Sequence, residues 1–311
     1  MVRTLWSRRE SNYLTLHGLV SKVCPSKPIC IDNHPLTRDY ATAGYVLQSP
    51  PPGFDSQRRL QPLTGLPDQR PFFGAACRSA STVSDMDIIL VAGLWLPSSI
   101  WEAVAVELVS LGHRPIPLSL PGVDDASAGA TLNDQIAAVL AAVDAADDPL
   151  VVGHSAACTL AWLAADRRAD SLAGVVMIGG FPSAPGSAYA SFFPVVDGVM
   201  AFPGWEPFDG PDSDDLDADA RAHIASMAVP VPGGVSTAIV ELSDDRRYGV
   251  PVAMVCPEFS PDQAKAWLAD GELPELARSE HVSFVDIDSG HWPMVTQPVK
   301  LARILDQIAQ G

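Results

Sequence analysis

Two short segments of this 311-residue chain carry residues suited to nucleophilic catalysis. The first is Gly153-His154-Ser155-Ala156-Ala157, which follows an apolar, strand-like run and precedes an alanine-rich segment of helical pattern. A serine at such a junction adopts a strained backbone, and only small residues two positions before and after it let strand and helix come close. Its hydroxyl is exposed at a helix N-terminus, where backbone N–H groups stabilise an oxyanion. The spacing predicts that Ser155 is a nucleophile.

The second segment is Gly290-His291-Trp292-Pro293, which directly follows the last strand-like run of the chain, 282–285. Histidine changes charge near neutral pH and is the usual general base for a serine hydroxyl. His291 is one of seven histidines in the chain and the one in this segment. His154, inside the first segment, is expected to pack beneath the nucleophile instead of acting as the base.

The elements that position these residues follow one another in a strand–helix alternation from Met86 onward. Strands are expected at 87–92, 116–120, 149–152, 174–178, 251–255 and 282–285, with amphipathic helices between them and a last helix over 298–308. Such an alternation predicts an α/β protein with a mostly parallel, doubly wound sheet.

The alternation is interrupted at about 182–249, a segment far longer than an ordinary loop between a strand and a helix. We expect an inserted cap there. Its aromatic residues either line an apolar pocket or form a small core of the cap. These aromatic residues are Phe181, just before the cap, and Tyr189, Phe192, Phe193, Phe202, Trp205 and Phe208 within it. The acidic run 212–217 is expected to be a solvated loop leading into a helix near Ala218.

Residues 86–311 resemble the α/β-hydrolase superfamily. The first segment is similar to the G-x-S-x-G elbow of that family, with Ala157 in place of the last glycine, and the second is similar to its G-H-W-P segment. The resemblance implies that Ser155 is the nucleophile, that His291 is the general base, and that the N–H groups of Leu94 and Ala156 form the oxyanion hole. Gly93-Leu94-Trp95 particularly resembles the branch containing plant methyl esterases and hydroxynitrile lyases.

The resemblance leaves the acid of the triad open. The family usually has an aspartate after the strand that here ends at Cys256, but this chain has Ser260 at that position. Glu258 lies two residues earlier, and its longer side chain is the first candidate to reach Nδ1 of His291. Asp262 is the second candidate, and a Ser–His pair without a carboxylate is the third.

Taken together, the motifs predict a serine hydrolase that cleaves a small to medium, mainly apolar carboxylic ester through an acyl-enzyme, without a cofactor. One alternative is a hydroxynitrile lyase or a C–C bond-cleaving member of the fold. A hydroxynitrile lyase would carry a lysine near the catalytic histidine, for which Lys265 is available. A third alternative is a ligand-binding member that lacks catalysis.

Charge separates the chain into two unlike parts. Residues 1–85 contain 10 of the 20 basic and 6 of the 37 acidic residues, and we expect this extension to be poorly ordered, or to reflect an over-extended start before Met86. The net charge of −17 argues against nucleic acid and anionic membranes as partners and favours a small-molecule substrate. Five cysteines without a C-x-x-C pair indicate neither a disulfide framework nor a metal site and favour the cytoplasm. The oligomeric state is left open.

Overall fold

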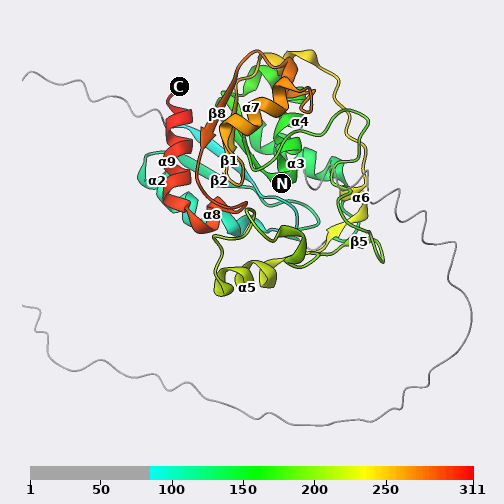
Figure 1. Cartoon of the computed structure of the whole chain (residues 1–311). Helices are drawn as coiled ribbons and strands as arrows, with labels where there is room; N and C mark the ends of the chain where they lie inside the picture. Colours follow the sequence, from blue (N-terminus) through cyan, green and yellow to red (C-terminus); the bar gives the residue numbers. More distant parts are fainter. Residues whose placement is uncertain (1–84, 126) are drawn as a thin grey trace, which may run out of the picture. The chain divides into compact units, whose positions relative to one another are not determined.

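The computed structural model describes residues 85–125 and 127–311 (Figure 1). The predicted extension over residues 1–85 lies outside this part, apart from its last residue. In the described part, six strands form a parallel sheet in the order β2, β1, β3, β4, β7, β8. The predicted fold class is therefore confirmed. The strands are β1 Asp87–Val91, β2 Arg114–Pro117, β3 Leu150–His154, β4 Gly174–Ile178, β7 Val252–Cys256 and β8 Val282–Asp286.

The strand order contains a reversal beside β1. The chain adds β2 on one side of β1 and β3 on the other. In an open parallel sheet, the loops that leave the carboxyl ends of two such strands diverge and create a crevice in which ligands bind. Gly93 follows β1 and Ser155 follows β3. The topology thus brings the predicted oxyanion loop and the predicted nucleophile to one edge of the sheet.

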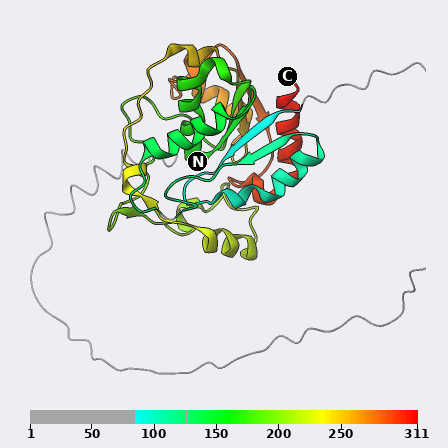
Figure 2. The same ribbon diagram turned by 180° about the vertical axis from the view of Figure 1, so that it is seen from behind.

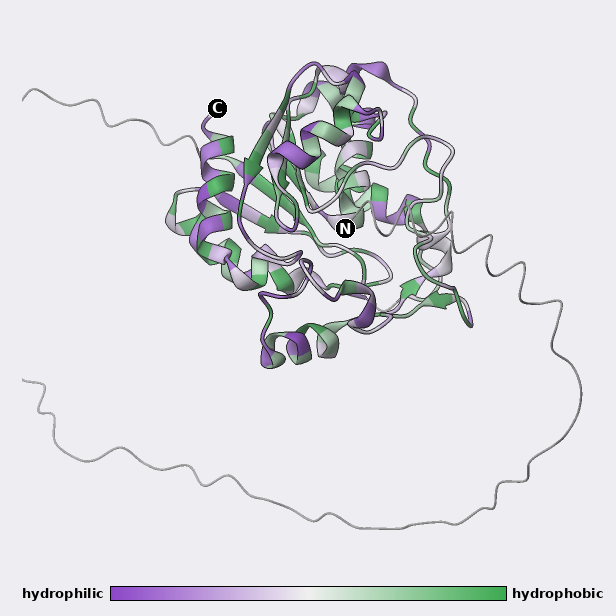
Figure 3. Cartoon of the chain, viewed as in Figure 1, coloured by the Kyte–Doolittle hydropathy of each residue, from purple (hydrophilic) through white to green (hydrophobic). Residues whose placement is uncertain are grey.

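Helices cover both faces of this sheet (Figures 1 and 2). The pair α2 and α9 packs on one face, and the pair α3 and α4 on the other. Figure 3 shows apolar strands between helices whose outer sides are hydrophilic. Every residue of β1, β3, β4 and β7 is buried, because both faces of these strands are covered. The helices are α2 Glu102–Ser110, α3 Leu132–Asp144, α4 Cys158–Arg168, α7 Pro261–Ala269, α8 Pro293–Thr296 and α9 Pro298–Ala309. None of the described helices is both long and apolar enough to cross a membrane.

The second strand lies earlier in the chain than its expected range of 116–120. The N–H groups of Arg114 and Leu118 donate to carbonyls of the β1 segment at 2.9 Å. Between them, Pro115 and Pro117 lack an N–H, which an edge strand such as β2 does not need on its open side. The prediction placed this strand too late because it followed the apolar side chains of 116–120, whereas the backbone pairs with β1 from Arg114 to Pro117.

Residues 182–249, which we call the cap segment, leave the sheet between β4 and β7. The indole of Trp95, in the loop after β1, donates to the carbonyl of Met200 at 3.0 Å, and the backbone carbonyl of Trp95 accepts from Val229 at 2.8 Å. The cap segment therefore contacts the loop that follows β1. Its elements are β5 Val199–Met200, which pairs antiparallel with β6 Val231–Pro232, and η4 Glu206–Phe208, α5 Ala218–Met227, α6 Gly233–Ser236 and η5 Asp245–Gly249.

Candidate active site

Ser155 lies at a sharp turn between β3 and α4. Its φ of 56° is in the left-handed region, which is unusual for a residue with a side chain. A Cβ on Gly153 would overlap the carbonyl oxygen of Ala157, and a Cβ on Gly180 would overlap that of Ser155. Only glycine fits at these two positions, because backbone atoms cannot move aside. The turn has the geometry of the nucleophile elbow that the spacing predicted.

The loop after β1 passes directly beside this turn. A Cβ on Gly93 would lie 2.8 Å from Nδ1 of His154 and 3.1 Å from Cβ of Ser155. The next residue, Leu94, is buried, as is Ala156 after the serine. Trp95 also has a positive φ, of 67°, so the loop turns sharply at this point. Both segments expected to donate to an oxyanion therefore flank Ser155.

His291 lies in the turn after β8, beside a buried carboxylate. Its Nδ1–H donates to Oε1 of Glu258 at 2.9 Å, and the Glu258 side chain, in the loop between β7 and α7, is only 1% exposed. Gly179 leaves room for the pair, since a Cβ there would lie 3.1 Å from Nδ1 of His291 and 3.3 Å from Oε2 of Glu258.

The electrostatics of this pair favour the protonated histidine. Burial lowers the pKa of His291, but the charge and hydrogen bond of Glu258, together with the charge of Asp212, outweigh that effect. The pKa of His291 is consequently raised above its ordinary value of 6.5. A raised pKa makes the imidazole a stronger proton acceptor.

The serine and the histidine are neighbours, although no hydrogen bond joins the Ser155 hydroxyl to His291 within the described residues. Gly180 lies against the backbone of Ser155, and the adjacent Gly179 lies against the His291 ring. The ring of His154, next to the serine, has its centroid 4.9 Å from that of His291. Hydrogen bonds between catalytic groups often close only when substrate is bound.

Asp262, the second candidate for the acid, and Ser260, which stands where the family has an aspartate, have other partners. The side chain of Asp262 is 93% exposed and forms an ion pair with Lys265 at 3.2 Å, one helical turn along α7. Ser260, at the position where an aspartate was expected, caps α7 by accepting from the N–H of Gln263 at 3.2 Å. Of the three residues, only Glu258 is joined to His291.

His154 holds the backbone of the other histidine. Its buried ring donates from Nε2 to the carbonyl of His291 at 2.8 Å. Burial first, and then the charge of His291, lower the pKa of His154 to about 3, so this ring is neutral over the working range of an enzyme. The low pKa makes Nδ1, the nitrogen of this ring that carries no proton, a weak proton acceptor, which disfavours His154 as a general base.

The acidic run 212–217 agrees only in part with its prediction as a solvated loop, because Asp214, Asp215 and Asp217 are exposed but its first two residues are not. Asp212 and Ser213 are buried, and the carbonyl of Asp212 accepts the N–H of His291 at 2.7 Å. The carboxylate of Asp215 accepts the N–H of Gly290 at 2.8 Å. Asp212 and Ser213 are buried because the start of the run packs on the histidine turn. Its end agrees with the prediction, since α5 begins at Ala218 with Asp217 as N-cap.

The profile of a known family matches most of the described chain. The model of the Alpha/beta hydrolase family covers residues 88–304. The chain belongs to the alpha/beta hydrolase family. Membership confirms the predicted resemblance and supports a hydrolase. A comparison with curated proteins gave no match.

Solved structures with the same fold are distant in sequence from this alpha/beta hydrolase. An extracellular alpha/beta-hydrolase from a Paenibacillus species is 17% identical with a TM-score of 0.60, covering 72% of this chain and 98% of that one. Polyneuridine aldehyde esterase is 15% identical with a TM-score of 0.55, covering 72% and 99%. Tomato methylketone synthase I is 15% identical with a TM-score of 0.54, covering 72% and 97%. At such identities the likeness shows the fold.

The cap aromatics of this alpha/beta hydrolase pack onto both loops of the site. Trp95, after β1, contacts cap rings at centroid distances of 5.5 to 6.2 Å, and Trp292, after His291, contacts two of them at 5.2 and 5.4 Å. The cap rings involved are Phe193, Phe202, Trp205 and Phe208. They therefore form a core shared by the cap segment and the loops after β1 and β8, a possibility that the sequence alternatives did not include.

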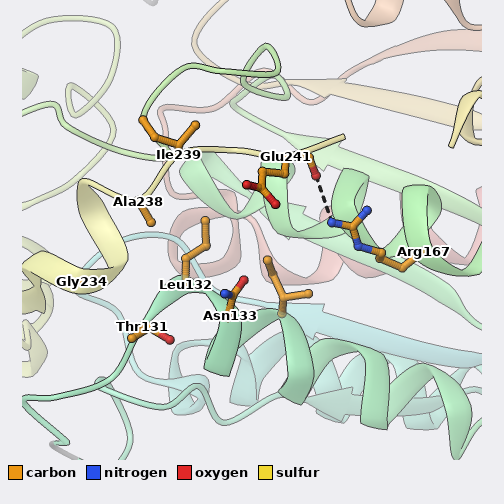
Figure 4. A pocket seen from close by; sticks show the side chains of 9 residues that line it. Thr131, Leu132, Asn133, Arg167, Gly234, Ala238, Ile239 and Glu241 are labelled. Atoms are coloured by element: carbon orange, nitrogen blue, oxygen red, sulfur yellow. Dashed lines mark hydrogen bonds between the residues drawn. The ribbon is translucent and has the colours of Figure 1, made fainter. Parts of the chain in front are cut away.

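A hollow of about 310 Å³ lies elsewhere, between the start of α3, the end of α4 and the α6 region (Figure 4). Arg167 on its wall donates from Nη2 to the carbonyl of Glu241 at 3.1 Å. None of Ser155, His291 and Glu258 lines this hollow. In the part of the chain that the structure describes, no cluster of three or more His, Cys, Asp or Glu side chains is arranged to hold a metal ion.

Proposed function

We propose that this alpha/beta hydrolase is a serine esterase that cleaves small to medium, mainly apolar carboxylic esters. The observation that carries the proposal is the buried hydrogen bond from His291 to Glu258, 2.9 Å long, in a turn adjoining the strained elbow of Ser155. An oriented imidazole beside a serine in such a conformation supports a nucleophile, a base and an acid acting together. In this proposal Glu258 is the triad acid.

The reaction has two halves. In the first, Oγ of Ser155 attacks the ester carbonyl while Nε2 of His291 takes the hydroxyl proton, and Glu258 stabilises the imidazolium. The N–H groups of Leu94 and Ala156 stabilise the tetrahedral oxyanion, which collapses with release of the alcohol as His291 returns the proton. In the second half, His291 deprotonates a water that attacks the acyl-enzyme, and the carboxylic acid leaves as Ser155 regains its proton.

The surroundings of the site support an apolar small-molecule substrate. Aromatic rings flank the site loops on the cap side, with Trp95 after β1 and Trp292 after His291. Apolar walls bind the hydrocarbon part of an ester and exclude water from the oxyanion. The esterase among the structural neighbours is consistent with the proposal.

The lyase alternative receives less support. The lysine considered for that role, Lys265, lies on α7, where it pairs with Asp262 and stands 6.0 Å from the ring of Phe284. This ion pair is exposed, and among the described residues no contact joins Lys265 to His291. Burying the carboxylate of Glu258 costs free energy, even with His291 as its partner. A non-catalytic ligand-binding role would not require this pair.

The proposal is tested by p-nitrophenyl esters of short acids, measured for burst and steady-state release, together with labelling by a fluorophosphonate. Ser155→Ala is expected to abolish both, while Ser110→Ala, an exposed serine at the end of α2, retains both. Turnover that survives in Ser155→Ala would exclude Ser155 as the nucleophile. A wild-type protein that neither turns over nor labels would exclude the esterase proposal.

A further inference from the structure

The turn that carries His291 is held by polar groups from three separate parts of the chain. Glu258 holds the ring, and His154 holds the carbonyl of His291. The two backbone N–H groups are both held by the cap segment: that of His291 by the carbonyl of Asp212 at 2.7 Å, and that of Gly290 by the carboxylate of Asp215 at 2.8 Å. The cap segment thus determines where the backbone of the turn lies.

The contact between Asp215 and Gly290 is close enough to exclude a side chain. A Cβ on Gly290 would overlap the carboxylate of Asp215 and lie 2.5 Å from the carbonyl oxygen of Asp212. The oxygen of Asp212 belongs to the backbone and cannot rotate aside, so a side chain at position 290 would push the turn away from the cap segment.

The acidic run is itself fixed from the other side. Arg221, on α5, donates from Nη2 to the carbonyl of Ser213 at 2.8 Å and from Nε to that of Leu216 at 3.4 Å. These two carbonyls stand on either side of Asp215 in the chain. The carboxylate is therefore presented to Gly290 by a segment that α5 holds in place.

We propose that Asp215 is a positioning residue for catalysis, which sets the height of the His291 imidazole above Ser155 by holding the backbone N–H of Gly290. The inference rests on the proposed function and adds a residue to it. Asp215 reaches the backbone only, so it acts through His291 and takes no proton. A carboxylate that accepts a backbone N–H makes a stronger hydrogen bond than a neutral acceptor. Without it, the turn relaxes and the imidazole leaves the line of proton transfer.

Three variants test this role. Asp215→Ala removes the acceptor, and Asp215→Asn keeps an oxygen in the same place. Asp214→Ala is the control, because it removes the adjacent carboxylate, which is exposed like that of Asp215, and leaves the bond from Gly290 to Asp215 intact. We expect Asp215→Ala to lower kcat and the rate of fluorophosphonate labelling by about 10- to 100-fold, with KM within about threefold. Asp215→Asn is expected to recover most of the loss, and Asp214→Ala to match the wild type.

A second readout does not depend on turnover. The Nδ1 proton of His291 should give a low-field NMR resonance, which is assigned by its absence in Glu258→Gln. Of the three variants, only Asp215→Ala should shift or broaden this resonance. The proposal would be overturned if Asp215→Ala left both the rates and the resonance unchanged. It would also be overturned if Asp215→Asn were as impaired as Asp215→Ala, or if Asp215→Ala changed KM alone. If the wild type neither labels nor turns over, the esterase proposal fails, and the resonance still decides whether Asp215 positions His291.

Discussion

At the scale of single residues, the proposed mechanism depends on how completely His291 is immobilised. Its ring, its N–H and its carbonyl each have a partner, from Glu258, Asp212 and His154 respectively. A side chain held on all sides loses little further entropy when the transition state forms, so orientation contributes directly to the rate. Two predictions concern the carboxyl groups around this histidine.

The first concerns Glu258. Because its charge and hydrogen bond raise the pKa of His291, the acid limb of the kcat/KM profile should lie above pH 6.5 in the wild type and move to lower pH in Glu258→Gln. The variant should also lose roughly two to four orders of magnitude in kcat. Asp262→Asn, which changes the exposed rival carboxylate, serves as the control and should behave as the wild type. A larger loss in Asp262→Asn than in Glu258→Gln would reverse the assignment.

The second concerns Asp212 and stability. Burial raises the pKa of Asp212 from 3.8 to about 6, against the opposing charge of His291 and with the help of Glu258. Between pH 4 and 6, the folded state therefore holds a proton on Asp212 that the unfolded state has released. The contribution of this proton to the unfolding free energy is complete below about pH 4 and is lost as the pH rises through 6.

Urea unfolding at a series of pH values measures this effect. Relative to Asp212→Asn, the wild type should lose roughly 2 to 3 kcal/mol of unfolding free energy between pH 4 and pH 7. Asp214→Asn should run parallel to the wild type, because that carboxyl is exposed. Parallel curves for the wild type and Asp212→Asn would show that Asp212 does not titrate in this way.

At the scale of elements, the site depends on how closely strands and helices approach each other. The turn from β3 to α4 brings Gly153 against the backbone of Ala157, and the loop after β4 brings Gly180 against Ser155. The cap segment then joins the loop after β1, through Trp95, to the turn after β8, through Asp215. The proposed oxyanion loop and the histidine turn are consequently linked through one inserted segment.

Gly153→Ala tests the close approach at the elbow. The new methyl group would overlap the carbonyl of Ala157, so we expect a loss of about 3 kcal/mol or more in unfolding free energy. Gly129→Ala is the matched control, since a Cβ there meets no atom within 4 Å, and it should change stability by less than about 1 kcal/mol. Similar urea midpoints for the two variants would contradict the steric argument.

At the scale of the whole molecule, the described core is built from residues that follow Met86. The first fully buried residue of the sheet core is Ile88, where the family match also begins. The acidic balance also belongs to this part, which contains 31 of the 37 Asp and Glu residues. We therefore propose that residues 86–311 form a self-supporting domain.

A variant that starts at Met86 is therefore expected to unfold cooperatively and to keep kcat/KM within about twofold of the full chain. The comparison needs circular dichroism during heating and the p-nitrophenyl ester assay on both proteins. Aggregation or loss of activity in the shorter protein would show that residues 1–85 are required, contrary to their prediction as a dispensable extension.

The sequence alone determined the features that depend on local sterics and periodicity. The alternation of strand-like runs with amphipathic helices predicted the parallel sheet. The small residues around Ser155 predicted the elbow, because a strand-to-helix turn restricts the size of the residues beside it. It did not determine which carboxyl group meets His291. Glu258 and Asp262 each lie two positions from Ser260, where the family has its aspartate. Only the packing of the loop before α7 buries Glu258 and leaves Asp262 exposed.

The acidic run is the clearest case in which tertiary structure decided. Asp215 and Gly290 are 75 positions apart, so no local pattern connects them, and a run of aspartates is ordinarily a solvated loop. One signal was present: the glycine before His291 marks a close approach of another backbone. Its partner could be identified only once the cap segment was folded over the turn, because long-range contacts follow from the packing of whole elements and not from the spacing of residues.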